Sequence, residues 1–117
     1  MRIGIVVTLW HNVSHKIPNY LGSVFNSLSS QDFNGSIDIL FVDNQSSDAF
    51  FSSLKDMCLR FSNEKVAFSC VSEKEHYYHF SSMNLGFYIL NQHAHYDIFG
   101  YSADDVFFAD SAGLSAA

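Results

Sequence analysis

The stretch "IDILFVDNQSSD", residues 37–48, combines the signals that decide the fold of this chain. Its first half, "IDILFV", is a short apolar run, typical of a strand buried in a parallel sheet. Its second half, "DNQSSD", supplies turn residues and residues that cap helix N-termini. Residues 49–61 then place apolar side chains at helical spacing. A strand, a polar turn and an amphipathic helix in this order predict one unit of an α/β sheet.

The same alternation recurs on both sides of this stretch. Apolar and β-branched runs predict further strands, and apolar side chains at helical spacing predict further helices. The other predicted strands are residues 3–8, 66–71 and 97–102, and the other predicted helices are 18–30 and 80–94. Seven elements in the order β-α-β-α-β-α-β predict an open, mainly parallel sheet with flanking helices on both faces.

Composition predicts one globular domain. The chain has 117 residues, is 48% hydrophobic and contains 1 proline, enough for a hydrophobic core. Its formal net charge is -6 and no basic run occurs, so we expect no nucleic-acid partner. We interpret "MRIGIVVTLW" as a first strand, not a signal peptide, and no apolar run approaches the ~20 residues of a membrane span. We expect Cys58 and Cys70 to be reduced thiols in a cytoplasmic protein.

Polar clusters follow three of the predicted strands. They are "TLWHN" (8–12), "DNQSSD" (43–48) and "ADD" (103–105). Ligands of open parallel sheets bind beyond the carboxyl ends of the strands. The topology therefore predicts that these clusters meet at one ligand-binding edge.

The acidic residues of these clusters each allow two interpretations. Asp43 is either an ordinary turn or cap residue, or an acceptor for a base imide N–H or a ribose hydroxyl. Asp104 and Asp105 form either a solvated turn or a site for Mg²⁺ or Mn²⁺, hard cations that prefer oxygen ligands. Such a cation could hold a diphosphate in an acidic protein that lacks a basic patch.

Several other chemistries lack their motifs in this sequence. The chain contains no G-x-S-x-G elbow, no G-x-G-x-x-G and no P-loop pattern. The paired histidines, His76 with His79 and His93 with His95, fit a polar loop and a helix end better than a zinc site, because no cysteine is near them in sequence.

Taken together, the motifs resemble the N-terminal, nucleotide-binding half of family 2 inverting glycosyltransferases with the GT-A fold. The matching segments are "IVVTLWHN" (5–12), "IDILFVDNQSSD" (37–48), "MNLG" (83–86) and "YDIFGYSADDV" (96–106). The resemblance implies a Rossmann-like sheet of the GT-A type. It also implies that residues 1–117 are a single domain that binds a nucleotide-diphosphate sugar, as the N-terminal part of a longer GT-A domain.

The resemblance also implies roles for individual residues. Asp43 would contact the base, usually uracil or thymine, with Asn44 beside it. Asp104 would lie near the sugar or ribose, and Asp105 would bind Mg²⁺ or Mn²⁺ at the diphosphate. The nucleoside would be lined by Thr8, Leu9 and Trp10, and Asn84 and Gly86 would belong to a helix packed beneath the site. The donor would be UDP- or dTDP-linked and the acceptor a glycan or a lipid-linked sugar, as in cell wall or polysaccharide biosynthesis.

The chain departs from the family pattern at several positions. Thr8 replaces the usual proline, Met83 stands where an arginine or histidine is common, and Ala103 replaces the first acidic or amide residue of the D-x-D motif. A nucleotidyltransferase-like domain is a weaker alternative, because "TLWHNVSHK" lacks a glycine-rich basic loop.

The family's catalytic base belongs to the half that follows the D-x-D motif, and we assign that role to no residue here. We therefore expect either part of a longer enzyme, completed by a C-terminal half or a partner chain, or a non-catalytic nucleotide-sugar-binding or assembly module. Relatives in this family often act in the cytoplasm at the cytosolic face of a membrane, and we expect the same location for this chain.

Overall fold

The computed structural model describes residues 1–10, 19–73 and 79–103 of the chain. They form the strands β1 (Arg2–Trp10), β2 (Ser36–Asn44), β3 (Val66–Glu73) and β4 (Ile98–Ala103), and the helices α1 (Asn19–Ser29), α2 (Asp48–Phe61) and α3 (His79–His93). Every predicted element is present in the predicted order, and its ends lie within about two residues of the predicted ones.

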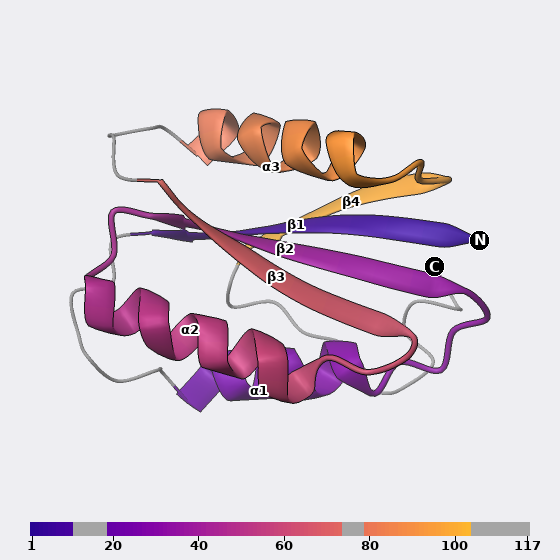
Figure 1. The fold of residues 1–117 in the computed structure, drawn as a ribbon, viewed down its shortest axis with the longest axis horizontal. Helices are drawn as coiled ribbons and strands as arrows, with labels where there is room; N and C mark the ends of the chain where they lie inside the picture. Colours follow the sequence, from indigo (N-terminus) through magenta and orange to yellow (C-terminus); the bar gives the residue numbers. More distant parts are fainter. Residues whose placement is uncertain (11–18, 74–78, 104–117) are drawn as a thin grey trace.

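The strands form one parallel sheet in the order β3-β2-β1-β4. Figure 1 shows α1 and α2 beneath this sheet and α3 above it, which confirms the predicted helices on both faces. The strand order changes direction between β1 and β4, because the chain passes from one edge strand, β3, over the sheet to the other. In open α/β sheets this reversal marks the crevice where ligands bind.

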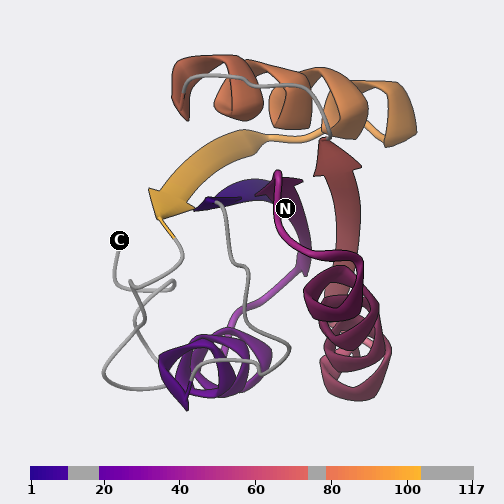
Figure 2. The same cartoon turned by 90° about the vertical axis from the view of Figure 1, so that its left-hand side faces the viewer.

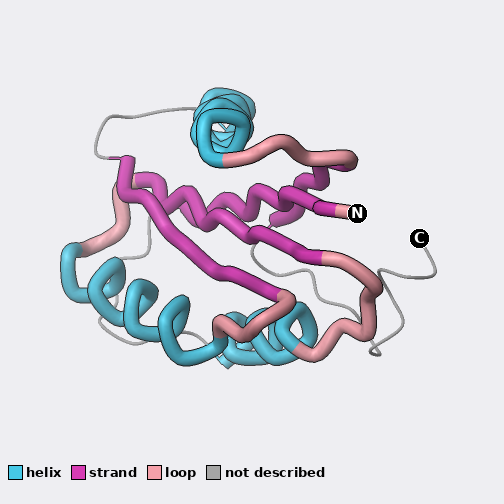
Figure 3. Tube along the Cα trace, turned by 45° about the vertical axis from the view of Figure 1, so that its right-hand side comes forward, coloured by secondary structure: helices cyan, strands magenta, loops and turns pink. Residues whose placement is uncertain are grey.

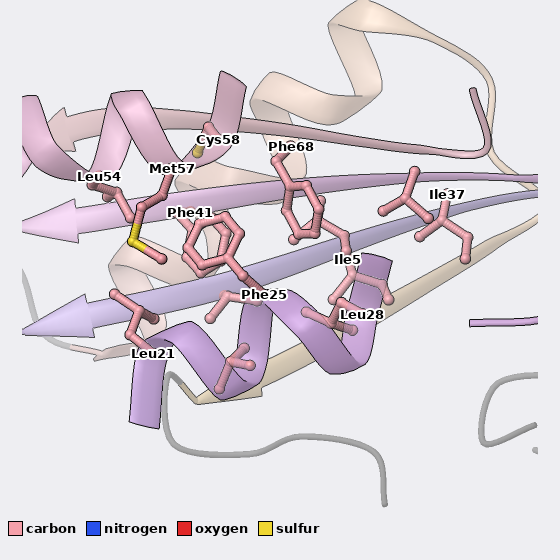
Figure 4. Close-up of a cluster of buried hydrophobic side chains, with 14 of the residues drawn as sticks. Ile5, Leu21, Phe25, Leu28, Ile37, Phe41, Leu54, Met57, Cys58 and Phe68 are labelled. Atoms are coloured by element: carbon pink, nitrogen blue, oxygen red, sulfur yellow. The ribbon is translucent and has the colours of Figure 1, made fainter. Parts of the chain in front are cut away.

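The larger core lies between the sheet and the helices α1 and α2, and we call it the α1/α2-face core. Phe25 of α1 is fully buried, and its ring stacks on that of Phe41 with centroids 4.8 Å apart. Phe68 of β3 lies at the same centroid distance of 4.8 Å from Phe25, and Figure 4 shows the three rings together. Burial of such a side chain stabilises the fold by about 1.5–3 kcal/mol, so this cluster fixes α1 on the sheet.

A smaller core lies between the sheet and α3, and we call it the α3-face core. It contains Val6, Leu40, Val42, Leu90 and Tyr96. Gly86 lets α3 approach the sheet closely, since a Cβ at this position would lie 2.5 Å from Val6 Cγ1 and 3.1 Å from Val42 Cγ2. The glycine predicted to pack beneath the site therefore sets the distance between α3 and the central strands.

A polar network holds the amino ends of the strands together. Arg2 donates hydrogen bonds to Asp38 Oδ2 from Nε at 3.0 Å and from Nη2 at 2.6 Å, and Tyr96 donates to the same oxygen at 2.7 Å. The Arg2 guanidinium also lies 5.3 Å from the centre of the Tyr96 ring. Burial, followed by the hydrogen bond to Asp38, raises the pKa of Tyr96. The network ties β1 and β2 to the segment that enters β4.

Within the described ranges, no helix has the length and apolar character needed to cross a membrane.

Candidate functional site

The carboxyl ends of β1, β2 and β4 meet at one edge of the sheet. Figure 2 views the molecule from this side, with β4 and β1 between α3 above and α1 below. In the strand register, Leu9 pairs with Asp43 and Trp10 pairs with Asn44. On the other side of β1, Thr8 pairs with Ala103, the last described residue. The fold thus brings Leu9 and Trp10, from the described part of the first predicted cluster, beside Asp43 and Asn44 of the second, and places the start of the third beside Thr8.

The pleat of the strands sends neighbouring residues to opposite faces. Val6 and Val42 lie on the α3 face, and Thr8 and Asn44 lie two residues after them, on the same face. Val7 and Asp43, between these pairs, lie on the opposite face. Leu9 lies on the other face, is 1% exposed and packs in the α1/α2-face core. A ligand at this edge would therefore meet residue 9 through its backbone, whereas the Trp10 side chain is 46% exposed.

Asp43 is fully buried at the carboxyl end of β2. It is a ladder residue between Leu9 and Ser72, so it belongs to the strand and not to the turn. The helix cap is another residue, Ser47, whose Oγ accepts a hydrogen bond from Phe50 N over 3.1 Å. Neither a turn nor a cap role accounts for Asp43. A carboxylate is costly to bury, which makes its position at the carboxyl end of β2 notable.

Two side-chain hydrogen bonds organise the α3 side of this edge. Asn44 Nδ2 donates to Ser82 Oγ over 3.1 Å, which joins the end of β2 to α3. Thr8 Oγ1 and Tyr101 OH lie 2.9 Å apart and share a hydrogen bond, which joins the ends of β1 and β4. The proline usual in the resembling family could not make the second bond, so Thr8 has a structural use at this position.

The turn after Asn44 contains an unusual backbone conformation. Gln45 has a φ of 61°, in the left-handed region that non-glycine residues rarely adopt. Its N–H donates to Glu73 O over 2.9 Å, so the turn is tied to the end of β3. Figure 3 shows this short connection running from β2 into α2. Backbone strain of this kind collects at functional sites, and here it lies directly after Asp43 and Asn44.

Sequence reasoning did not single out Ser82, Tyr101 or Gln45. Ser82 and Tyr101 are distant in sequence from their partners Asn44 and Thr8, and no local pattern reports such contacts. Gln45 carries no signal of its own, because glycine or asparagine is the residue type that normally marks a positive φ.

The predicted metal ligand lies outside the described residues, as do Asp104 and the other residues after Ala103. The described part of the chain contains no group of three or more His, Cys, Asp or Glu side chains that could hold a metal ion. Asn84, on α3, is exposed, and so are His93 and His95. The cation site therefore stays a prediction from sequence.

A groove of about 300 Å³ lies elsewhere, over the middle of β2 and β3 beside the second half of α3. It is lined by Asp38, Leu40, Ala67, Ser69, Ile89, Leu90 and His93. Its strand residues come from the first five residues of β2 and the first four of β3, so the groove is separate from the edge that holds Asp43 and Asn44.

Comparison with known proteins rests on structure alone. No family model matches the sequence, and no curated protein matches it significantly. A mannosyltransferase, PcManGT from Pyrobaculum calidifontis in complex with GDP-Man and Mn²⁺, superposes with a TM-score of 0.73 at 16% identity, over 97% of this chain and 30% of its own. TarS of S. aureus superposes with a TM-score of 0.63 at 16% identity, over 99% of this chain and 19% of its own.

These likenesses confirm the expected Rossmann-like α/β fold, which is found in a solved glycosyltransferase. The chain spans less than a third of the length of either solved protein. At 16% identity the likeness shows the fold alone.

Proposed function

We propose that this domain binds the nucleotide-diphosphate sugar donor of a glycosyltransferase of the family 2 type. The donor would lie across the carboxyl ends of β1, β2 and β4. A divalent cation, Mg²⁺ or Mn²⁺, would take part in binding. In the complete enzyme the sugar would pass with inversion to a hydroxyl of a glycan or lipid-linked acceptor.

One observation carries the proposal: the strand register gathers the polar ends of separate strands at the point where the strand order reverses. Asp43 and Asn44 end β2 directly beside Leu9 and Trp10 of β1, and Ala103, which precedes Asp104, pairs with Thr8. This is the position at which open α/β sheets bind their ligands. The fold is shared with a mannosyltransferase solved in complex with GDP-Man and Mn²⁺, which supports the proposal.

The residues of the edge suit different parts of such a donor. The buried Asp43 would accept a hydrogen bond from the base, and the exposed Trp10 ring offers a flat apolar surface for the nucleoside. Asp104 would lie near the ribose or sugar, and Asp105 would hold the cation. The bound cation would offset the charge of the diphosphate as it leaves.

A second function, a non-catalytic nucleotide-sugar-binding or assembly module, is favoured by one specific position. Ala103, paired with Thr8, offers no ligand where the resembling family has an acidic or amide residue. Such a module would bind the nucleotide but would neither transfer the sugar nor hydrolyse the donor. Assay of nucleotide release with and without an acceptor separates the two functions.

Ligand-dependent thermal stabilisation tests donor binding across candidates. The melting temperature would be measured with UDP-, dTDP- and GDP-sugars in the presence of Mn²⁺. At a ligand concentration 100 times the Kd, linkage predicts a stabilisation of about 2.7 kcal/mol. Asp43→Asn should lose this response, whereas the matched control Asp56→Asn, at an exposed position on α2, should keep it. If no sugar nucleotide shifts the melting temperature of the folded wild-type protein, the proposal is wrong.

A further inference from the structure

The sheet face that packs against α1 and α2 changes from apolar to polar at the same level on β2 and β3. Phe41 pairs with Cys70, and both side chains pack in or against the α1/α2-face core. Two residues further along each strand, Asp43 pairs with Ser72. Side chains two residues apart on a strand share a face, and neighbouring strands lie about 4.7–4.9 Å apart. The buried Asp43 carboxylate therefore has a hydroxyl group as its cross-strand neighbour.

The hydroxyl of Ser72 is buried beside this carboxylate. Its Oγ is shielded from solvent and has no hydrogen-bond partner in the part of the chain that the structure describes. A buried hydroxyl that makes no hydrogen bond destabilises the fold, whereas an apolar side chain of similar size does not carry this cost. A ligand group that bonds to Ser72 Oγ would remove the cost, and the residue lies one position before the carboxyl end of β3.

The carboxyl ends of β2 and β3 are fixed relative to each other. The Gln45 N–H donates to Glu73 O over 2.9 Å, directly beyond the paired Asp43 and Ser72. The left-handed conformation of Gln45, with a φ of 61°, belongs to the same connection. The two side chains are thus held in place before a ligand binds, which lowers the entropy that binding must spend on ordering them.

We propose that Ser72 is a specificity-determining residue of the donor site, whose hydroxyl donates a hydrogen bond to a carbonyl of the nucleotide base while Asp43 accepts from the neighbouring ring N–H. The inference rests on the proposed function and names the class of base that the site takes. A carboxylate only accepts hydrogen bonds, whereas a serine hydroxyl also donates. Uracil, thymine and guanine match this pair, because each has a ring N–H beside a carbonyl. Cytosine and adenine present a bare ring nitrogen there, which the carboxylate repels.

The test is isothermal titration calorimetry of the wild-type protein with UDP, dTDP, GDP, CDP and ADP, each with Mn²⁺. One of the first three should bind most tightly, and CDP and ADP should bind at least about tenfold more weakly, since they leave polar groups of the site unpaired. Ser72→Ala should weaken binding of the preferred nucleotide about three- to tenfold and change CDP and ADP by less than about twofold. Ser72→Thr keeps the hydroxyl and should keep the preference.

Urea denaturation without nucleotide separates this role from a structural one. Because Ser72 Oγ has no partner among the described residues, Ser72→Ala should unfold at the same urea concentration as the wild type or at a higher one. Ser69→Ala is the matched control, at an exposed position of the same strand, and should change neither nucleotide binding nor unfolding.

Three results would overturn the inference while leaving donor binding intact. The wild-type protein could prefer CDP or ADP, Ser72→Ala could keep the wild-type base preference, or Ser72→Ala could weaken all five nucleotides equally and lower stability. If the folded wild-type protein binds none of the five, the inference is also wrong, and titration with the corresponding sugar nucleotides then decides the proposed function separately.

Discussion

Asn44 Nδ2 donates a hydrogen bond of 3.1 Å to Ser82 Oγ, and this buried contact fixes the carboxyl end of β2 to the first turn of α3. It is one link between β2, the strand that carries Asp43, and α3. Loss of the link should loosen the candidate site.

Replacement of the acceptor should therefore cost stability. Ser82→Ala removes a buried hydrogen-bond partner of Asn44, and we expect a loss of about 1–3 kcal/mol in the free energy of unfolding. The neighbouring Ser81 is exposed, so Ser81→Ala is the matched control and should stay within about 0.5 kcal/mol of the wild type. Urea denaturation measures both variants, and equal effects would show that the hydrogen bond adds no stability.

The approach of α3 to the sheet gives a second prediction. Gly86→Ala would place a methyl group 2.5 Å from Val6 Cγ1 and 2.9 Å from Val6 Cγ2, so α3 must shift, at a cost of about 1–3 kcal/mol. A Cβ added to Gly22 of α1 would meet nothing within 4 Å, so Gly22→Ala should stabilise the protein by about 0.5–1 kcal/mol. Thermal or urea unfolding should show a loss of stability for Gly86→Ala and a gain for Gly22→Ala. If Gly86→Ala is as stable as the wild type, the close packing of α3 on Val6 is contradicted.

The left-handed conformation of Gln45 gives a third prediction, best measured between two variants. Gln45→Gly and Gln45→Ala both remove the side chain, but only glycine adopts a φ of 61° without strain. We expect Gln45→Gly to be more stable than Gln45→Ala by about 1 kcal/mol in urea denaturation. Equal stabilities would mean that the turn relaxes to another conformation in solution.

The amino-end network predicts a dependence of stability on alkaline pH. Burial and the hydrogen bond to Asp38 raise the pKa of Tyr96, whereas an unfolded tyrosine ionises near pH ~10. Since the folded pKa is the higher one, the contribution of Tyr96 is complete below pH ~10 and declines as the pH rises above it. Tyr96→Phe should be less stable than the wild type at neutral pH, and the difference should shrink above pH ~10. If the difference in stability between Tyr96→Phe and the wild type does not change with pH, the Tyr96 hydroxyl takes no part in the network.

The elements and their order could be predicted because each depends on a local pattern. The buried run "IDILFV" and the helical spacing of 49–61 report their structure within a few residues, and the parallel sheet follows from their alternation. The position of β4 beside β1, and not beside β3, is set by the crossing of the chain through α3, which no local pattern reports.

The candidate site could be predicted only in part, for the same reason. The strand ends that meet in the register were predicted from topology, and Asp43 is found at the sheet edge as expected. The bonds of Asn44 to Ser82 and of Thr8 to Tyr101 join residues far apart in sequence, so they emerge only in the folded chain. The roles of Asp104 and Asp105 lie outside the described residues and stay predictions.

The central claim, donor binding through a divalent cation, is tested most directly by isothermal titration calorimetry. The folded wild-type protein would be titrated with UDP-, dTDP- and GDP-sugars, each with and without Mn²⁺, beside Asp43→Asn and Asp105→Asn. The proposal predicts saturable binding of at least one sugar nucleotide, weakened at least about tenfold when Mn²⁺ is withheld or Asp105 is replaced. Asp43→Asn should weaken it even with Mn²⁺ present. If the folded protein binds none of these donors under either condition, the claim is contradicted.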